Sequence, residues 1–172
     1  MIQTAIALIA EQGLSASTAN IAKQAGVAGG TLFTYFDSKE ALFNQAYLSI
    51  KADIAAAVSG SGSGDWQQQM RQWWHAYTDW GLRHPRERAA VRQLESSLLL
   101  TQQTRQQARE MFAPMWQILD EAERSGRFYL PLDFTVPMME GMAETAIQHL
   151  AAPSLPGQQA AFEMMWRALV KP

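Results

Sequence analysis

The chain of 172 residues contains no cysteine, and only 17% of its residues are charged. The missing cysteines exclude disulfides, thiolate metal sites, thiol nucleophiles and iron–sulfur clusters, and they fit a reducing compartment such as the cytoplasm. The 14 Lys and Arg are balanced by 16 Asp and Glu. The overall charge therefore lacks the basic excess that is typical of nucleic-acid-binding proteins.

Long apolar runs are also missing. The longest, such as Ala5–Ala10, are far shorter than the ~20 residues that a helix needs to cross a bilayer. The first residues contain neither a basic segment nor a cleavage site, so we expect no export signal. With 48% hydrophobic residues the chain is too apolar for disorder. Its length fits one domain, or two small domains that share an interface.

Strand patterns are absent too, and the sequence predicts about nine helices. Apolar and polar residues never alternate over the length of a strand, while Ala, Leu, Gln, Glu, Arg and Met are frequent. The predicted helices are 2–12, 19–25, 28–35, 37–58, 65–83, 86–100, 104–125, 134–151 and 157–170. Either Ser17 or Thr18 caps the second, and Asp37 with Glu40 forms a capping box for the fourth. Residues 59–64 alternate Ser and Gly and are interpreted as a linker, and Pro114 should kink or split the seventh helix.

Residues 19–35 have the layout of a helix-turn-helix motif. Ala22 and Ala25 are small enough for a second helix to cross closely, and Gly26 can adopt the left-handed conformation of the turn. The residues expected in the core of this motif are Ile21, Leu32, Phe33 and Phe36. Those expected to face outward are Ala28, Gly29, Thr31, Thr34 and Tyr35.

This region contains Ala10-Glu11-Gln12-Gly13-Leu14, Ser17-Thr18, Ile21-Ala22, Ala25-Gly26-Val27 and the run GTLFTYFDSKEAL from Gly30 to Leu42. With these residues it resembles the TetR family of transcriptional regulators. The resemblance spans roughly the first third of the chain. It implies an all-α fold in which a three-helix DNA-binding domain, residues 1–45, precedes a helical bundle, residues 46–172, that binds a ligand and dimerises.

The resemblance also implies contacts with double-stranded operator DNA. Thr18, Thr31, Tyr35 and Lys39 would bind the DNA backbone, and their hydroxyl, phenol and ammonium groups are suited to phosphate. Asn20, Ala28, Gly29 and Thr34 would face the bases, where small side chains allow close approach and a Thr methyl can contact thymine.

The charges near this motif are balanced, with three Lys against four Asp and Glu in residues 1–59. Either a basic arm precedes this chain, or the protein binds DNA through few ion pairs and with a shallow salt dependence. The basic residues concentrate later, at Arg83, Arg86, Arg88, Arg92, Arg105 and Arg109. These arginines either lie on solvated helix faces, which we favour, or form an anionic effector site or an additional contact with the DNA backbone.

Large apolar side chains follow helical spacing in the second half of the chain. The expected ligand-binding residues are Met70, Trp73, Tyr77, Trp80, Phe112, Met115, Trp116 and Met142. Each stripe alone fits an ordinary core, but wide aromatic rings with flexible Met together favour an adaptable cavity for a planar apolar ligand. His75 is a candidate for binding a polar group of that ligand, and Asp79, Glu95 and Glu144 for selecting a cation.

The last two predicted helices mix small residues with Met, which permits close helix packing in a homodimer. The expected interface residues are Met138, Ala146, His149, Ala161, Met165 and Ala168, although Met165 can instead belong to the core of a single protomer.

The three His have no metal-ligand spacing and no Ser lies in a nucleophile elbow, so we expect no metal, no cofactor and no enzymatic activity. The sequence predicts a repressor that binds palindromic DNA as a dimer and is released by a small hydrophobic or aromatic inducer. The alternative is a helical small-molecule-binding protein that keeps the fold but binds DNA weakly or not at all.

Overall fold

The computed structural model describes residues 1–59, 64–150 and 155–172, and its helices form two compact units. Unit 1 comprises residues 1–53 and 84–111, and unit 2 comprises residues 54–83 and 112–172. The described residues form ten α-helices, one turn of 3-10 helix and a single isolated β-bridge between Phe128 and Val170. The all-α prediction is therefore confirmed. None of the described helices is long and apolar enough to span a membrane.

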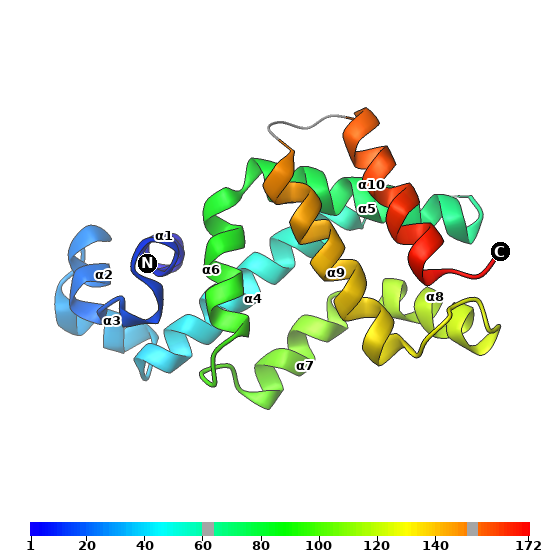
Figure 1. The fold of residues 1–172 in the computed structure, drawn as a ribbon. Helices are drawn as coiled ribbons and strands as arrows, with labels where there is room; N and C mark the ends of the chain where they lie inside the picture. Colours follow the sequence, from blue (N-terminus) through cyan, green and yellow to red (C-terminus); the bar gives the residue numbers. More distant parts are fainter. Residues whose placement is uncertain (60–63, 151–154) are drawn as a thin grey trace. The chain divides into compact units, whose positions relative to one another are not determined.

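Unit 1 contains the amino-terminal helices together with two helices from the middle of the chain (Figure 1). Its elements are α1 (Ile2–Gln12), the 3-10 turn η1 (Gly13–Ser15), α2 (Thr18–Gln24), α3 (Gly29–Tyr35), the first part of α4 (Lys39–Val58), α6 (Pro85–Glu95) and α7 (Gln102–Glu110). Helix α1 packs against α6 and α2, and α2 packs against α3. The apolar face of α1, with Ile6 and Ile9, is buried, and so are Ile21 and Leu32.

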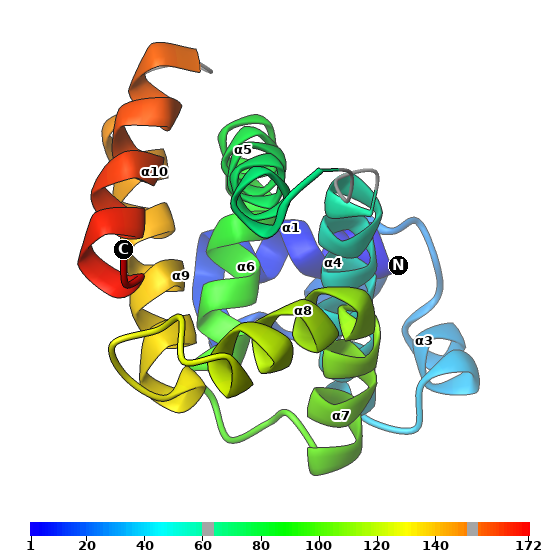
Figure 2. The same ribbon diagram turned by 90° about the vertical axis from the view of Figure 1, so that its right-hand side faces the viewer.

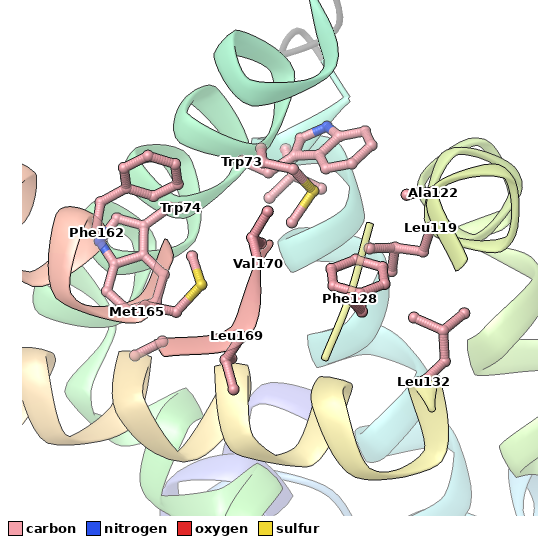
Figure 3. Packing of buried hydrophobic residues seen from close by; sticks show 13 residues of the cluster. Trp73, Trp74, Leu119, Ala122, Phe128, Leu132, Phe162, Met165, Leu169 and Val170 are labelled. Atoms are coloured by element: carbon pink, nitrogen blue, oxygen red, sulfur yellow. The ribbon is translucent and has the colours of Figure 1, made fainter. Parts of the chain in front are cut away.

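Unit 2 contains the end of α4, α5 (Trp66–Arg83), α8 (Ala113–Arg124), α9 (Leu132–His149) and α10 (Leu155–Leu169). Helix α5 packs against both α9 and α10, which lie side by side (Figure 2). Its core is aromatic: Trp74, Phe162 and Met165 gather between α5 and α10, as Figure 3 shows. The Phe162 ring lies 6.2 Å from Trp74 and 5.6 Å from Trp166, measured between ring centroids.

Pro114 splits the expected seventh helix into α7 and α8, which is why ten helices replace the predicted nine. Pro114 is the second residue of α8, a position where its missing N–H breaks no helical bond. The sixth helix ends at Glu95 rather than at residue 100. Ser97 ends it locally, because its hydroxyl donates to the carbonyl of Leu94 and accepts from the N–H of Leu99.

The helix caps correct one prediction and decide another. Ser17, not Thr18, caps α2, since its Oγ accepts a hydrogen bond from the N–H of Asn20 at 3.2 Å. The cap of α4 is Ser38, whose Oγ accepts from the N–H of Ala41 at 3.1 Å. The predicted cap at Asp37 is therefore wrong, because α4 begins at Lys39 and Asp37 lies one residue too early. Most of the expected linker, residues 60–63, lies outside the described residues.

The two compact units do not have the bounds of the expected domains, which are residues 1–45 and 46–172. Helices α6 and α7 belong with the helix-turn-helix motif, and α4 contributes residues to both units. A functional boundary at residue 45 stays a prediction, and its two sides are not separate compact bodies.

Candidate nucleic-acid interface and effector core

The turn between α2 and α3 is fixed by backbone hydrogen bonds. Gly26 has φ +70°, and its N–H donates to the carbonyl of Lys23 at 3.2 Å. The N–H of Val27 donates to the carbonyl of Ala22 at 3.0 Å. These two bonds form a Schellman motif, which ends α2 and requires a left-handed residue at Gly26. A short helix, a glycine turn and a second short helix are the elements of a helix-turn-helix motif.

Helix α3 presents small and polar groups to the solvent. Ala28, Gly29, Thr34 and Tyr35 are exposed, the last at 69% of its surface, and Thr31 is partly exposed. A Cβ atom added at Gly29 would meet nothing within 4 Å. The first turn of α3 can therefore approach another surface closely, with hydroxyl and phenol groups beside it. This is the arrangement expected for the outward face of the motif.

Phe33 differs from expectation. It was predicted in the core with Leu32 and Phe36, but it is 53% exposed, whereas Leu32 is fully buried and Phe36 is half-buried. The prediction of Phe33 as a core residue is therefore wrong. One turn of helix separates Phe33 from Gly29, so the ring lies on the same exposed face. The hydrophobicity of Phe33 favours burial, whereas its position on the helix, one turn after Gly29, indicates exposure.

Three of the expected DNA-binding side chains also make contacts within the chain. Lys39 Nζ donates to the carbonyl of Leu14 at 2.7 Å, which ties α4 to η1. Thr34 Oγ1 donates to the carbonyl of Gly30, and Asn20 Oδ1 accepts from Gln24, each at 3.4 Å. The two long bonds are weak, so Thr34 and Asn20 can exchange them for another partner. Lys39 has a firm structural role in addition to its expected one.

A buried asparagine that the sequence did not reveal links α4 to the α6–α7 connection. Asn44 is 6% exposed, and its Nδ2 donates to the carbonyls of Glu40 at 2.7 Å and Leu99 at 2.8 Å. Its Oδ1 accepts from the N–H of Thr101 at 3.0 Å. All three hydrogen bonds of the amide lie within unit 1. They connect α4, which follows the helix-turn-helix motif, to a segment 55 residues later in the chain.

One turn further along α4, Tyr47 and Lys51 both contact Glu95 at the end of α6. Lys51 Nζ lies 2.7 Å from Glu95 Oε1, and the Tyr47 hydroxyl donates to the same oxygen at 3.4 Å. Burial is the largest cause that raises the pKa of Tyr47, so the phenol stays protonated at neutral pH and donates. This pair of contacts adds polar links between α4 and α6.

The structure brings seven of the eight expected ligand-binding residues to one hydrophobic cluster in unit 2. Met70 and Trp73 are buried members of the cluster. Tyr77, Phe112, Met115, Trp116 and Met142 are partly buried and pack against it. Trp80 is buried too, and its ring stacks on Tyr77 with 6.4 Å between centroids. The expected ligand-binding residues therefore do lie together in unit 2. An ordinary hydrophobic core would place them together as well.

Polar side chains line the contact between α5 and α10, and the sequence predicts a binding role for two of them, His75 and Asp79. Gln158 is 1% exposed, and its Nε2 donates to Thr78 Oγ1 at 3.1 Å and to Asp79 Oδ1 at 2.6 Å. Arg71 Nη2 lies 2.9 Å from Glu163 Oε1. Burial, and then the charge of Arg71, lower the pKa of His75, while Asp79 and Gln158 oppose them. The imidazole is therefore neutral at pH 7.

The expected dimer residues fall into two groups. Met138, His149 and Ala168 are exposed, and Ala146 and Ala161 are partly exposed, so all five can contact another molecule. Met165 is 1% exposed and belongs to the core cluster of its own protomer, as the second interpretation of this residue had it. Met165 is therefore removed from the expected interface.

Within residues 1–59, 64–150 and 155–172, no three His, Asp or Glu side chains come together as metal ligands would. The geometry thus offers one exposed candidate surface, the face of α3 with the start of α4, and it gathers the expected ligand-binding residues in the aromatic core of unit 2.

Comparison with known proteins agrees with this geometry. Residues 1–46, which span α1 to α3 and the start of α4, match the model of a family described as bacterial regulatory proteins, tetR family. A tetR-family transcription regulator from Shewanella sp. PV-4 is 29% identical, with a TM-score of 0.84 over 99% of this chain and 96% of that chain. A regulator from Vibrio parahaemolyticus is 25% identical, with a TM-score of 0.77 over 99% and 97%. A regulator from Marinobacter aquaeolei VT8 is 21% identical and shares the fold, with a TM-score of 0.90 over 99% and 94%.

Proposed function

We propose that this chain, which belongs to the TetR family of bacterial regulatory proteins, is a ligand-responsive transcriptional regulator that works as a repressor. The observation that carries the proposal is the exposed face of α3, behind a turn fixed by Gly26, in the segment that matches the family. We expect the protein in the cytoplasm, where its DNA target is.

For DNA, we propose that α3 enters the major groove. Thr18, Thr31, Tyr35 and Lys39 would bind backbone phosphates, and Ala28, Gly29 and Thr34 would lie against base edges, with Asn20 at the margin. The exposure of Phe33 adds a group that can contact a thymine methyl. Most of these phosphate contacts come from hydroxyl groups. Because a hydroxyl group carries no charge, it releases few counterions from the DNA.

The charge of unit 1 supports binding through few ion pairs. Unit 1 contains eight Lys and Arg against seven Asp and Glu, a net charge of +1, because α6 and α7 bring arginines to it. We therefore expect a slope of log K against log salt of about −2 to −4 for the dimer, from two to four neutralised phosphates. A slope near −8 in a salt titration would contradict this expectation.

For the dimer, we propose that α9 and α10 pair with the same helices of a second copy. Exposed apolar side chains lie along both: Phe134 and Met138 on α9, and Met164 on α10. Helices from two protomers would bury these residues together with Ala146, His149, Ala161 and Ala168. Sedimentation equilibrium tests this: Met138→Glu should shift the chain to a monomer, whereas Leu98→Glu, at an exposed leucine of unit 1, should not.

For the effector, we propose that a small apolar or aromatic compound enters the cluster of unit 2 and acts through α4. This helix runs continuously from unit 1, where Asn44 holds it, to Val58 in the cluster. A ligand that repacks the cluster would bias the position of Val58 and hence the separation of the two α3 helices in a dimer. It can shift that equilibrium only by its difference in affinity for the two states.

A mobility-shift assay with the DNA that flanks the protein's own gene tests the proposal. The wild-type chain should retard this DNA at concentrations at which scrambled DNA stays free. A Thr31→Ala, Tyr35→Ala double variant should fold normally and lose this preference, while Gln45→Ala, an exposed change on α4, should keep it. Equal retardation of both DNAs by the wild type would favour the alternative, a ligand-binding protein that keeps the fold without specific DNA binding.

A further inference from the structure

Two buried nitrogen atoms on α5 have no hydrogen-bond partner among the described residues: Nε of Arg71 and Nδ1 of His75. The two residues are four positions apart and therefore share one face of the helix. Buried polar atoms in folded proteins are nearly always hydrogen-bonded, and one without a partner costs about 1–3 kcal/mol. Two such atoms on one helix face point to a polar partner beyond the residues that the structure describes.

The side chains around these nitrogens are held in place by other bonds. Arg71 donates through Nη2 to Glu163 and lies over the ring of Phe162, with Cζ 5.1 Å from its centroid. These two contacts fix the guanidinium and leave its Nε–H unused. Next to His75 on the helix, Trp74 Nε1 donates to the carbonyl of Gln158 at 3.1 Å. The Nε–H of Arg71 is thus presented by a side chain with a defined position, as a binding site requires.

The charges at this contact are already balanced. Arg71 is paired with Glu163, and Asp79 is paired with Arg83 at 3.0 Å. Since Arg71 is already paired with Glu163 and His75 is neutral at pH 7, neither side chain offers an unpaired cation to an anionic ligand. A neutral oxygen fits better: it can accept from the Nε–H of Arg71, and a hydroxyl can also donate to an unprotonated Nδ1 of His75.

This polar pair borders the aromatic cluster. Phe162 lies under Arg71 and is at the same time a fully buried member of the cluster, beside Trp74 (Figure 3). Trp73 and Trp74 lie between Arg71 and His75 in the sequence of α5 and are both buried in the cluster. A ligand with an aromatic body among these rings could thus turn an oxygen toward Arg71 and His75.

We propose that Arg71 and His75 form the polar end of the effector site and bind the hydroxyl or carbonyl oxygen of an otherwise apolar, aromatic ligand. This inference rests on the proposed function, because it assumes that the cluster of unit 2 receives the effector. It adds the chemical class: a neutral aromatic compound with one oxygen-bearing substituent, rather than a pure hydrocarbon or a carboxylate.

Isothermal titration calorimetry of the full chain at pH 7.5 tests this with 2-naphthol, naphthalene and 2-naphthoate. These probes share a planar body and differ in the polar group. In the wild type, 2-naphthol should bind at least about 10-fold more tightly than naphthalene, since a site that hydrogen-bonds a hydroxyl discriminates against its absence. The carboxylate should bind more weakly than 2-naphthol.

Two variants test whether Arg71 and His75 cause the preference for 2-naphthol over naphthalene. Arg71→Lys keeps a cation for Glu163 but removes the Nε–H, and His75→Phe removes Nδ1 but keeps a ring. Each should reduce the advantage of 2-naphthol to less than about 3-fold and leave naphthalene binding nearly unchanged, while His84→Phe in unit 1 should retain the full advantage. Circular dichroism checks the folding of both variants, and either folded variant suffices for the test.

Three outcomes would overturn the inference. Equal affinities for 2-naphthol and naphthalene in the wild type, or an advantage that survives both Arg71→Lys and His75→Phe, would remove the polar pair from the site while leaving the apolar effector site standing. Tightest binding of 2-naphthoate would replace the neutral group by an anion. Binding of none of the three probes would overturn this inference together with the proposed effector site.

Discussion

The two units of the molecule differ in where their distinctive side chains lie. Unit 2 contains all six Trp and seven of the nine Met, most of them in or against one interior cluster, and has a net charge of −3. Unit 1 has no Trp and a net charge of +1, and its distinctive residues are small or polar groups on the exposed face of α3.

The two proposed tasks place different demands on the helices of each unit. Contact with DNA requires an exact outer surface, which short helices with fixed caps and a fixed turn provide. Binding of an apolar ligand requires an interior that can repack, which wide rings and flexible Met provide. Substitutions of the aromatic core residues of unit 2 should therefore lower stability, whereas substitutions on the exposed face of α3 in unit 1 should lower DNA affinity.

The largest expected effect is on the stability of unit 2. Phe162→Ala removes a fully buried ring that contacts Trp74 and Trp166, and it should lower the free energy of unfolding by about 3–5 kcal/mol. Phe33→Ala in unit 1 removes a half-exposed ring and should cost less than about 1 kcal/mol. Urea unfolding followed by circular dichroism measures both free energies. Equal losses for the two variants would contradict the expected difference between the units.

The next effect tests the polar interior of unit 1. Asn44→Ala removes an amide that makes three hydrogen bonds and should lower the free energy of unfolding by about 2–3 kcal/mol, because the carbonyl of Leu99 and the N–H of Thr101 lose their partner. Asn20→Ala, whose amide makes only a long bond to Gln24, should cost less than about 0.5 kcal/mol. A small loss for Asn44→Ala in the same unfolding experiment would show that this amide is dispensable.

A smaller effect is expected on DNA affinity without a change in stability. Tyr35→Phe removes the phenol oxygen from an exposed ring of α3 and should weaken operator binding by about 10-fold, or ~1.4 kcal/mol. Tyr129→Phe makes the same change on an exposed tyrosine of unit 2 and should leave affinity unchanged. Fluorescence anisotropy of labelled DNA measures both, and similar affinities for the two variants would argue against a phosphate contact by Tyr35.

The smallest effect is the pH dependence that His75 gives to unit 2. Its pKa is lower in the folded protein than the usual 6.5, so the unfolded chain takes up a proton first as pH falls. The contribution of His75 is therefore present above pH 6.5 and is lost as pH falls below that value. Unfolding free energies between pH 7.5 and 5 should decline less steeply in His75→Phe than in the wild type or His84→Phe, and parallel curves would reject this assignment.

The sequence was most informative where local rules decide the structure. The Gly26 turn, the outward face of α3 and the break at Pro114 all follow from backbone preferences within a few residues, and the family resemblance added the proposed DNA partner of that face. Phe33 was misplaced because its hydrophobicity was weighed above its position on the helix. The cap at Ser38 was missed by one residue because Asp37 and Ser38 are both good caps, and only the observed start of α4 decides between them.

What the sequence could not reveal depends on residues far apart in the chain. Asn44 meets Leu99 across 55 positions, and Gln158 meets Asp79 across 79. Neither pair leaves a periodic or spaced pattern in the sequence. The orphaned nitrogens of Arg71 and His75 are likewise visible only once α10 lies against α5, because that packing decides which of their atoms are buried and which are bonded.

Selection of random-sequence duplexes on the purified chain tests whether the exposed face of α3 reads DNA as part of a symmetric dimer. We predict enrichment of one palindromic motif whose half-sites lie about one helical turn apart, bound by two chains per duplex. Enrichment of no motif, with binding that is equal for all sequences, would show that α3 does not read a DNA sequence.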